Sequence, residues 1–225
     1  MCGRSSLTKT EKEIEKRFNA TFYSEELERY NPLPSSNICP SQMIPVITNQ
    51  DPSHLQLYRW GLIPSWAKDA KIGYKMFNAR KETILEKPAF RQAAVQRRCM
   101  VVMDSFYEWK KEGSNKKPYR ILVKNQPLIS VAGLWEMWIN PQTAEVLYSC
   151  TIITQPPNSF MAKIHNRMPA ILTPESERDW IDHKIKVEDA MQLLIPIESD
   201  TMEAYEMDPV KGKPNKNGKQ MNLFG

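Results

Sequence analysis

The sequence predicts a single α+β domain built on a curved, mostly antiparallel sheet. Its 225 residues exceed a typical domain of about 150 residues by half, which favours one substantial domain. Segments rich in β-branched and aromatic residues fill much of the chain from residue 97 onward, and the helical patterns lie toward its two ends. Helices segregated from hairpin-connected strands in this way are typical of an α+β fold.

The first helix is expected over residues 8–18. Thr8 and Glu11 have the spacing of a capping box, in which each residue satisfies a backbone N–H of the other. Ile14 and Phe18 lie one helical turn apart and supply a narrow apolar stripe. This stripe predicts that the helix packs one face against the core.

The region after this helix is dense in proline. Prolines between residues 30 and 45 predict an extended, loop-like segment, because proline disfavours helix both at its own position and before it. A strand is expected to begin at Val46, and another over residues 58–62. Residues 65–69 predict an exposed loop that carries Trp66.

The remaining sequence predicts the main strands and three more helices. The expected strands are residues 99–106, 119–123, 128–134, 146–154 and 168–172. The polar, lysine-rich stretch 110–117 predicts a hairpin tip between the first two of them. The expected helices are residues 158–165, residues 174–181 with Thr173 as the cap, and residues 187–194.

Composition excludes several classes of protein. The chain is 41% hydrophobic and 25% charged, and it has neither an apolar run of about 18 residues nor an apolar signal core, so we expect a cytoplasmic protein, associated with the nucleoid if bacterial, and no membrane partner. Four scattered cysteines without a CxxC pair, and three histidines, predict no metal site, no cofactor and no disulfide framework. The net charge of +5 is compatible with a polyanionic partner. Residues 211–225 predict a basic, flexible tail after a domain over residues 1–210.

Cys2 is the residue with the most distinctive chemistry. If Met1 is removed, Cys2 carries a free α-amine with a pKa near 8 beside a thiol with a pKa near 8.5. Such a 1,2-aminothiol condenses with an aldehyde to an imine, after which the sulfur closes a five-membered thiazolidine ring. An internal cysteine lacks the amine. The alternative is that Cys2 is simply the residue that follows the initiator.

Six sequence blocks occur in a specific order between residues 1 and 169. They are MCGR at residues 1–4, RWGLIPSWAKD at 59–69, FNARKET at 77–83, SFYEWK at 105–110, AGLWE at 132–136 and HNRMP at 165–169. Together they resemble the SOS response-associated peptidase (SRAP) family, the abasic-site processing proteins. The likeness extends to about residue 210 and implies a single domain with a barrel-like core.

The resemblance also implies a function and a set of site residues. Family members capture abasic sites in single-stranded DNA through a thiazolidine link, which the resemblance assigns to Cys2. It assigns the acidic catalytic residue to Glu108, the active-site histidine to His165, and the amide that holds the cysteine to Asn78. The structural alternatives are an exposed strand glutamate, a histidine at a helix end and an asparagine helix cap.

Four further residues are expected to contact DNA. Arg4 and Arg80 adjoin the catalytic blocks, and guanidinium groups suit phosphate. Trp66 could stack on an unpaired base, and Pro40 lies in the family's loop that wedges against DNA. Their alternatives are ordinary structural positions, since tryptophan is usually buried and proline usually marks a turn.

Three functions compete at this point. The first is a lyase-type enzyme that crosslinks itself to abasic DNA through Cys2, with Asn78, Glu108 and His165 assisting, as a monomer and without a cofactor. The second is a thiol peptidase, acting on its own leader or on other substrates, in which the Cys2 thiolate pairs with His165. The third is a noncatalytic module that binds single-stranded DNA.

Overall fold

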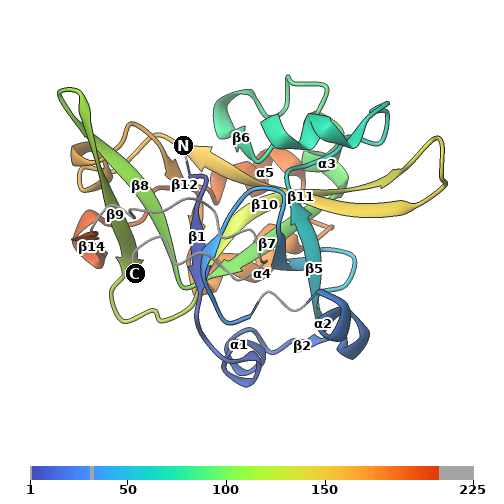
Figure 1. The fold of residues 1–225 in the computed structure, drawn as a ribbon, viewed down its shortest axis with the longest axis horizontal. Helices are drawn as coiled ribbons and strands as arrows, with labels where there is room; N and C mark the ends of the chain where they lie inside the picture. The colour runs from blue at the N-terminus through green and yellow to red at the C-terminus, as the bar shows by residue number, and fades with distance from the viewer. Residues whose placement is uncertain (1, 31–32, 208–225) are drawn as a thin grey trace.

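A closed ring of five strands forms the centre of the protein (Figure 1). The computed structural model describes residues 2–30 and 33–207, so the expected tail at 211–225 and the domain boundary at 210 lie outside the described residues. The strands of the ring are β4 (Met43–Thr48), β5 (His54–Trp60), β7 (Arg98–Met103), β10 (Ile129–Ile139) and β11 (Val146–Gln155). Neighbours around the ring are antiparallel, except that β5 and β11 run parallel where they close it. Every residue of β7 is buried.

A second sheet of five strands stands beside the ring, in the order β14-β9-β8-β1-β3. Its strands are β1 (Ser5–Leu7), β3 (Ser35–Ile38), β8 (Ser105–Glu112), β9 (Asn115–Val123) and β14 (Met202–Glu206). Strand β1 lies between β8 and β3, and Ser5 pairs with Phe106. This pairing brings the start of the chain next to the strand that contains Glu108.

Short strands and helices complete the fold. The short strands are β2 (Thr21–Phe22), β6 (Asn78–Arg80), β12 (Met168–Pro169) and β13 (Ile171–Leu172), and β6 runs parallel to β11. The α-helices are α1 (Glu11–Phe18), α2 (Ser24–Tyr30), α3 (Arg91–Gln96), α4 (Pro174–Ile181) and α5 (Val187–Gln192). The 3₁₀ helices are η1 (Ala70–Lys75), η2 (Lys81–Thr83), η3 (Met161–Lys163) and η4 (Ser199–Thr201). None of the helices in the described ranges is long and apolar enough to cross a bilayer.

The predicted α+β class with a barrel-like core is confirmed, as are several of its elements. The lysine-rich stretch 110–117 is the tip of the β8–β9 hairpin, with Glu112 opposite Asn115. Thr173 caps α4, which spans the predicted residues. The prediction missed α2, α3, β1, β3, β6 and β14, which are short and lack a strong periodic pattern.

The predicted capping box of the first helix is wrong by two residues. The box is formed by Thr10 and Glu13, and the helix begins at Glu11. Thr8 cannot cap it, because the backbone N–H and the hydroxyl of Thr8 both donate to the Asp104 carboxylate, at 2.5 and 2.6 Å. A tertiary contact therefore selects between two boxes with the same spacing.

Two predicted strands are each divided in the structure. Residues 99–106 contribute to β7 and β8, which belong to different sheets, and the break falls at Asp104, whose N–H donates to the Ser6 carbonyl oxygen. Residues 168–172 form β12 and β13, which pair with β11 and β10 respectively. Continuous apolar runs conceal such breaks, because both parts are buried. The predicted helix over residues 158–165 is only the single turn η3.

Candidate active site

The backbone of Cys2 is held against the barrel by Asn78. The Asn78 side-chain nitrogen donates to the Cys2 carbonyl oxygen at 2.8 Å, and Cys2 is fully buried. Asn78 begins β6, which is fixed by its pairing with Ile152 of β11. The Asn78 Oδ1 atom is buried, and no group in the described part of the chain donates a hydrogen bond to it. One end of this amide therefore positions Cys2, and the other end is available to a further donor.

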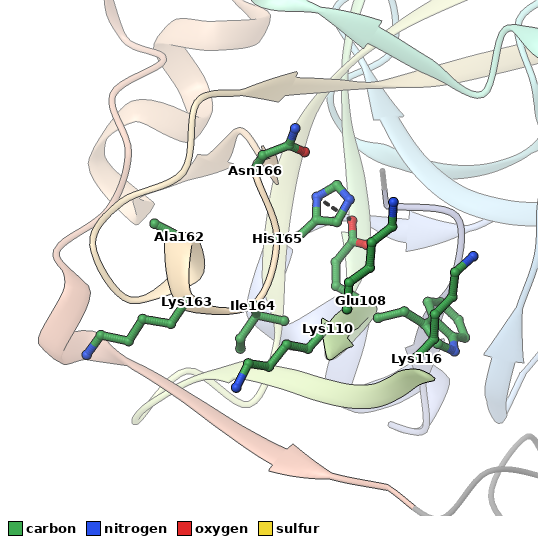
Figure 2. Close-up of a pocket in the computed structure, with 10 residues that line it drawn as sticks. Glu108, Lys110, Lys116, Ala162, Lys163, Ile164, His165 and Asn166 are labelled. Carbon is green, nitrogen blue, oxygen red and sulfur yellow. Dashed lines mark ion pairs between the residues drawn. The ribbon is translucent and has the colours of Figure 1, made fainter. Parts of the chain in front are cut away.

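Glu108 lies near Cys2, and His165 lies next to Glu108. Glu108 lies in β8 and is 2% exposed, and its Oε1 is 3.8 Å from His165 Nδ1 (Figure 2). His165 follows the η3 turn, and its backbone N–H donates to the Met161 carbonyl oxygen at 2.8 Å. We refer to Cys2, Asn78, Glu108 and His165 as the Cys2 cluster. Four segments that are distant in sequence thus meet at the start of the chain.

Backbone and side-chain groups surround Nδ1 of His165. The Arg167 backbone N–H donates to Nδ1 at 3.1 Å, which in the neutral ring places the proton on Nε2. The Glu108 carboxylate lies 3.8 Å from Nδ1 and the Arg167 carbonyl oxygen lies 3.3 Å from it. The ring orientation therefore favours the neutral tautomer with its proton on Nε2.

Burial controls the ionisation of Glu108 and Cys2. Loss of solvation raises the pKa of Glu108, and the positive charges of the chain's amino terminus and of His165 oppose this rise. Burial also raises the pKa of the Cys2 thiol, and the nearby Glu108 charge raises it further. The thiol is therefore neutral at physiological pH, whereas Glu108 titrates above the ordinary range of a glutamate.

A cavity of about 620 Å³ opens in front of Glu108 and His165 (Figure 2). One wall is the β8–β9 hairpin and the other is the segment that contains η3. The lining residues are Glu108, Trp109, Lys110, Lys111, Lys116, Ala162, Lys163, Ile164, His165 and Asn166. The cavity has the acid and the imidazole at its inner end and lysines around its mouth.

Asp104 anchors the strand that follows Cys2. Its carboxylate accepts hydrogen bonds from Ser6 and Thr8 of the N-terminal segment and pairs with Arg120 of β9 at 3.4 Å. Asp104 and Ser6 are almost completely buried. The network fixes β1 against β8 and so limits the positions that Cys2 can occupy. Sequence reasoning did not identify Asp104, although an aspartate inside a predicted apolar strand is an unusual residue.

The two arginines expected to contact DNA have different surroundings. The Arg4 Nη1 atom donates to Asn37 Oδ1 at 2.7 Å and to Cys39 Sγ at 2.8 Å, and the residue is half-buried. Arg80 is exposed, and within the described chain its guanidinium makes no hydrogen bond or ion pair. Arg80 is two residues from Asn78 in β6. Phosphate contact by either arginine stays a prediction, and Arg4 also has a structural task.

Trp66 and Pro40 lie outside the Cys2 cluster. Trp66 is 59% exposed on the predicted loop, which is fastened by the hydrogen bond of 2.7 Å from Trp138 Nε1 to the Ala67 carbonyl oxygen. Pro40 is half-buried directly after β3. An exposed indole on a fixed loop suits stacking on an unpaired base. The contacts of both residues with DNA stay predictions.

Sequence reasoning also missed Lys111, Lys116 and Lys163, which line the cavity. The lysine run was interpreted only as a hairpin tip. Its signal was the two-residue turn Gly113-Ser114, which determines which lysines face each other across the hairpin. In the described part of the chain, no group of three or more metal-binding side chains is arranged to hold an ion.

The fold and the site define a class of proteins: a small barrel in which a second sheet brings a cysteine near the chain start to an asparagine, a glutamate and a histidine. The family described as SOS response associated peptidase (SRAP) matches residues 1–214. The chain belongs to this family.

Known relatives are similar over nearly the whole chain. The abasic site processing protein YoqW of Bacillus subtilis is 46% identical over 224 residues, which cover 98% of each chain. The abasic site processing protein HMCES of Xenopus tropicalis is 33% identical over 89% of this chain and 72% of its own. A Bacteroides thetaiotaomicron protein of known crystal structure is 32% identical, with a TM-score of 0.84 over 92% of each chain.

Proposed function

We propose that this protein processes abasic sites in single-stranded DNA by crosslinking Cys2 to the lesion. The observation that carries the proposal is the Cys2 cluster, in which Asn78 fixes the Cys2 backbone near a buried glutamate that lies 3.8 Å from a half-buried histidine. The names of the relatives, abasic site processing proteins, support the same substrate. The proposed enzyme is lyase-type, needs no cofactor and acts as a monomer.

The proposed reaction starts when removal of Met1 frees the Cys2 amine. The amine adds to the aldehyde carbon of the open sugar, and loss of one water gives an imine. The Cys2 sulfur then adds to the imine carbon, while the thiol proton passes to the nitrogen and completes a thiazolidine. The closed ring no longer withdraws electrons from the sugar, so β-elimination is suppressed and the DNA strand stays intact.

Glu108 and His165 supply the proton transfers of this sequence. Ionised Glu108 accepts a proton from the Cys2 ammonium, and later from the thiol, whose raised pKa means that it needs a base. Protonated Glu108 or His165 gives a proton to the departing hydroxyl of the carbinolamine. His165 also protonates the sugar ring oxygen when the ring opens to the aldehyde. Because burial raises the pKa of Glu108, its carboxyl group is a stronger base than an ordinary glutamate.

Fewer observations support the alternative function, a cysteine peptidase. A cysteine peptidase uses a thiolate stabilised by a neighbouring imidazolium. Here burial and the Glu108 charge favour the neutral thiol, because both raise the pKa of Cys2. Nδ1 of His165 lies 3.8 Å from Glu108 Oε1 and accepts a hydrogen bond from the Arg167 backbone N–H. We therefore expect no cleavage of peptides supplied in trans.

The test is capture of an abasic oligonucleotide by the purified protein. Intact mass should show that Met1 is absent, and incubation should give an adduct of protein plus DNA minus one water that survives denaturation. Undamaged DNA of the same sequence is the control. Retention of Met1, or only salt-sensitive binding that ignores the lesion, would contradict the proposal. The reaction requires a reduced thiol, which the cytosol maintains.

A further inference from the structure

The cavity in front of Glu108 has a cationic mouth that the chemistry of Cys2 does not use. Lys111 and Lys116 come from the β8–β9 hairpin, and Lys163 comes from η3. Figure 2 shows Lys116 on the hairpin and Lys163 on the segment that forms the other wall. We refer to these three residues as the lysine rim. All three are exposed. They lie on the same cavity as the buried acid and imidazole, so a ligand bound to the rim adjoins the Cys2 cluster.

The hairpin register places like charges opposite each other. Lys110 faces Lys117, and Lys111 faces Lys116. Directly opposed like charges on neighbouring strands destabilise a hairpin. An arrangement that costs stability, and that an ordinary hairpin tip does not need, indicates a ligand that supplies the missing negative charge.

Among the described residues, carboxylates neutralise one of these two lysine pairs. Glu112 pairs with Lys110 at 3.0 Å and with Lys117 at 3.1 Å, and Glu206 lies 3.5 Å from Lys117. By contrast, none of the carboxylates in the described ranges lies within 4.0 Å of a lysine of the rim. The rim therefore contributes three positive charges to the lining of one cavity, and none of them has an acidic partner among the described residues.

We infer that the lysine rim binds backbone phosphates of the DNA strand on one side of the abasic site, an inference that rests on the proposed function. The reacting sugar carries its own phosphates a few bonds from the aldehyde carbon, so phosphates must pass close to Glu108 and His165. Lysine acts on phosphate as a point charge and requires no particular base. The rim therefore positions the strand without reading its sequence.

The other flank of the strand has a separate set of candidate contacts. Figure 1 shows β6, which carries Arg80, and the β8–β9 hairpin on two different sides of β1. A strand whose damaged sugar reaches the Cys2 cluster can thus meet the rim on one flank and Arg80 on the other. The inference predicts that the rim matters for one flank only.

The test uses an oligonucleotide with a tetrahydrofuran abasic analogue, which has no aldehyde and binds without reacting. For single-stranded DNA, the slope of log affinity against log salt decreases in magnitude by about 0.7 for each phosphate contact that the protein loses. The variant K111Q/K116Q/K163Q should therefore reduce this slope by about 2, and lower the affinity at 0.1 M salt roughly a hundredfold. The control K12Q/K16Q/K184Q removes the same charge from exposed lysines on α1 and after α4. It should leave the slope close to that of the unmodified protein.

The outcomes separate this inference from the proposed function. We refer to K111Q/K116Q/K163Q as the cavity variant. If the cavity variant and the control have equal slopes of log affinity against log salt, the rim does not bind phosphate and the inference is wrong. A different outcome is a salt slope that changes only in the cavity variant while the unmodified protein forms no covalent adduct with aldehyde-bearing DNA. In that case the rim binds phosphate, and the crosslinking proposal is wrong. The thermal unfolding midpoint of the variant should be no lower than that of the control variant, which shows that it is folded. Should the triple variant not fold, K116Q and K163Q are tested singly, each with an expected slope change of about 0.7.

Truncated oligonucleotides test the assignment to one flank. With the analogue at the 5′ end or at the 3′ end, the loss of slope in the cavity variant should disappear for one of the two oligonucleotides and persist for the other. An equal loss with both would contradict the assignment to one flank.

Discussion

The inner end and the mouth of the cavity differ in how firmly the protein holds their side chains. Cys2 and Glu108 at the inner end are buried, and Asn78 fixes Cys2 by a hydrogen bond of 2.8 Å. Lys116 and Lys163 at the mouth are exposed and have no charged partner among the described residues. Fixed groups determine which reaction occurs, whereas exposed cations determine how strongly a polyanion is held. Substitutions at the two ends should therefore fail in different ways.

The largest expected effect is the loss of the stable adduct in Cys2→Ala and Cys2→Ser. Either variant can still form an imine through its amine, but alanine has no second nucleophile and the serine hydroxyl closes a ring poorly. Neither should give an adduct that survives heating, whereas borohydride reduction should trap the imine. An undiminished, heat-stable adduct with Cys2→Ser would rule out ring closure by sulfur. Binding to the tetrahydrofuran analogue should be unchanged in both.

Glu108→Gln should slow adduct formation by about 10²- to 10⁴-fold while leaving DNA binding intact. Because burial raises the pKa of Glu108, the ionised base is lost at a higher pH than for an ordinary glutamate. The rate of the unmodified protein should therefore rise with pH through this raised value, and that limb should be absent in the variant. Single-turnover rates across the pH range measure both effects.

Stability provides the control for Glu108→Gln. A raised pKa in the folded state means that the fold binds this proton more tightly than the unfolded chain does. The associated stabilisation is present at low pH and is lost as the pH rises through the folded value. Removing the charge should therefore not lower the unfolding midpoint at neutral pH. A variant that fails to fold would favour a structural role for Glu108.

Asn78→Ala should reduce the crosslinking rate by about tenfold, a smaller effect than that of Glu108→Gln. It removes the hydrogen bond to the Cys2 carbonyl oxygen, worth about 1 kcal/mol, and leaves the nucleophile and base in place. Asn78→Asp keeps an acceptor but loses the donor. If Asn78→Asp crosslinks at the rate of the unmodified protein, Asn78 does not act by donating a hydrogen bond to Cys2.

The sequence indicated candidate residues for the site but not the contacts that bring them together. Cys2, Glu108 and His165 lie in blocks that resemble a family, so their roles could be expected without geometry. Their proximity depends on β1 pairing with β8 and on β6 pairing with β11, which are contacts between distant segments. The Asp104 network is of the same kind, because an isolated aspartate gives no indication of its partners in advance.

Errors in the predicted elements have a related cause. The box at Thr8 and the box at Thr10 are equivalent as local patterns, and only the contact of Thr8 with Asp104 decides between them. Burial on both sides makes residues 99–103 apolar throughout, so the change of sheet is marked only by the polar pair Asp104 and Ser105 and by no change of period. Local patterns therefore predict the existence of elements better than their limits.

Arg4 is held by hydrogen bonds, whereas Arg80 is exposed, so substitutions of these two arginines compare a fixed cation with an exposed one. Arg80→Gln should lower the salt slope of DNA binding by about 0.7 and leave stability unchanged. Arg4→Gln should instead cost roughly 1–3 kcal/mol of folding free energy, because it leaves the buried Asn37 without its charged partner. Denaturant unfolding measures the stability of each variant, and salt titration measures the salt slope of DNA binding for each. A larger change of slope in Arg4→Gln than in Arg80→Gln would reverse the assignment.

The smallest expected effect is a gain in stability at the mouth of the cavity. Lys116→Gln removes the repulsion between Lys116 and Lys111, so it should stabilise the protein by about 0.2–1 kcal/mol. Lys12→Gln, an exposed substitution on α1, is the control and should change stability by less. Because the repulsion is electrostatic, the gain should shrink as salt is added. A stability gain combined with weaker DNA binding would show that the hairpin retains an unfavourable charge pair for its ligand, whereas a loss of stability would mean that Lys116 supports the fold.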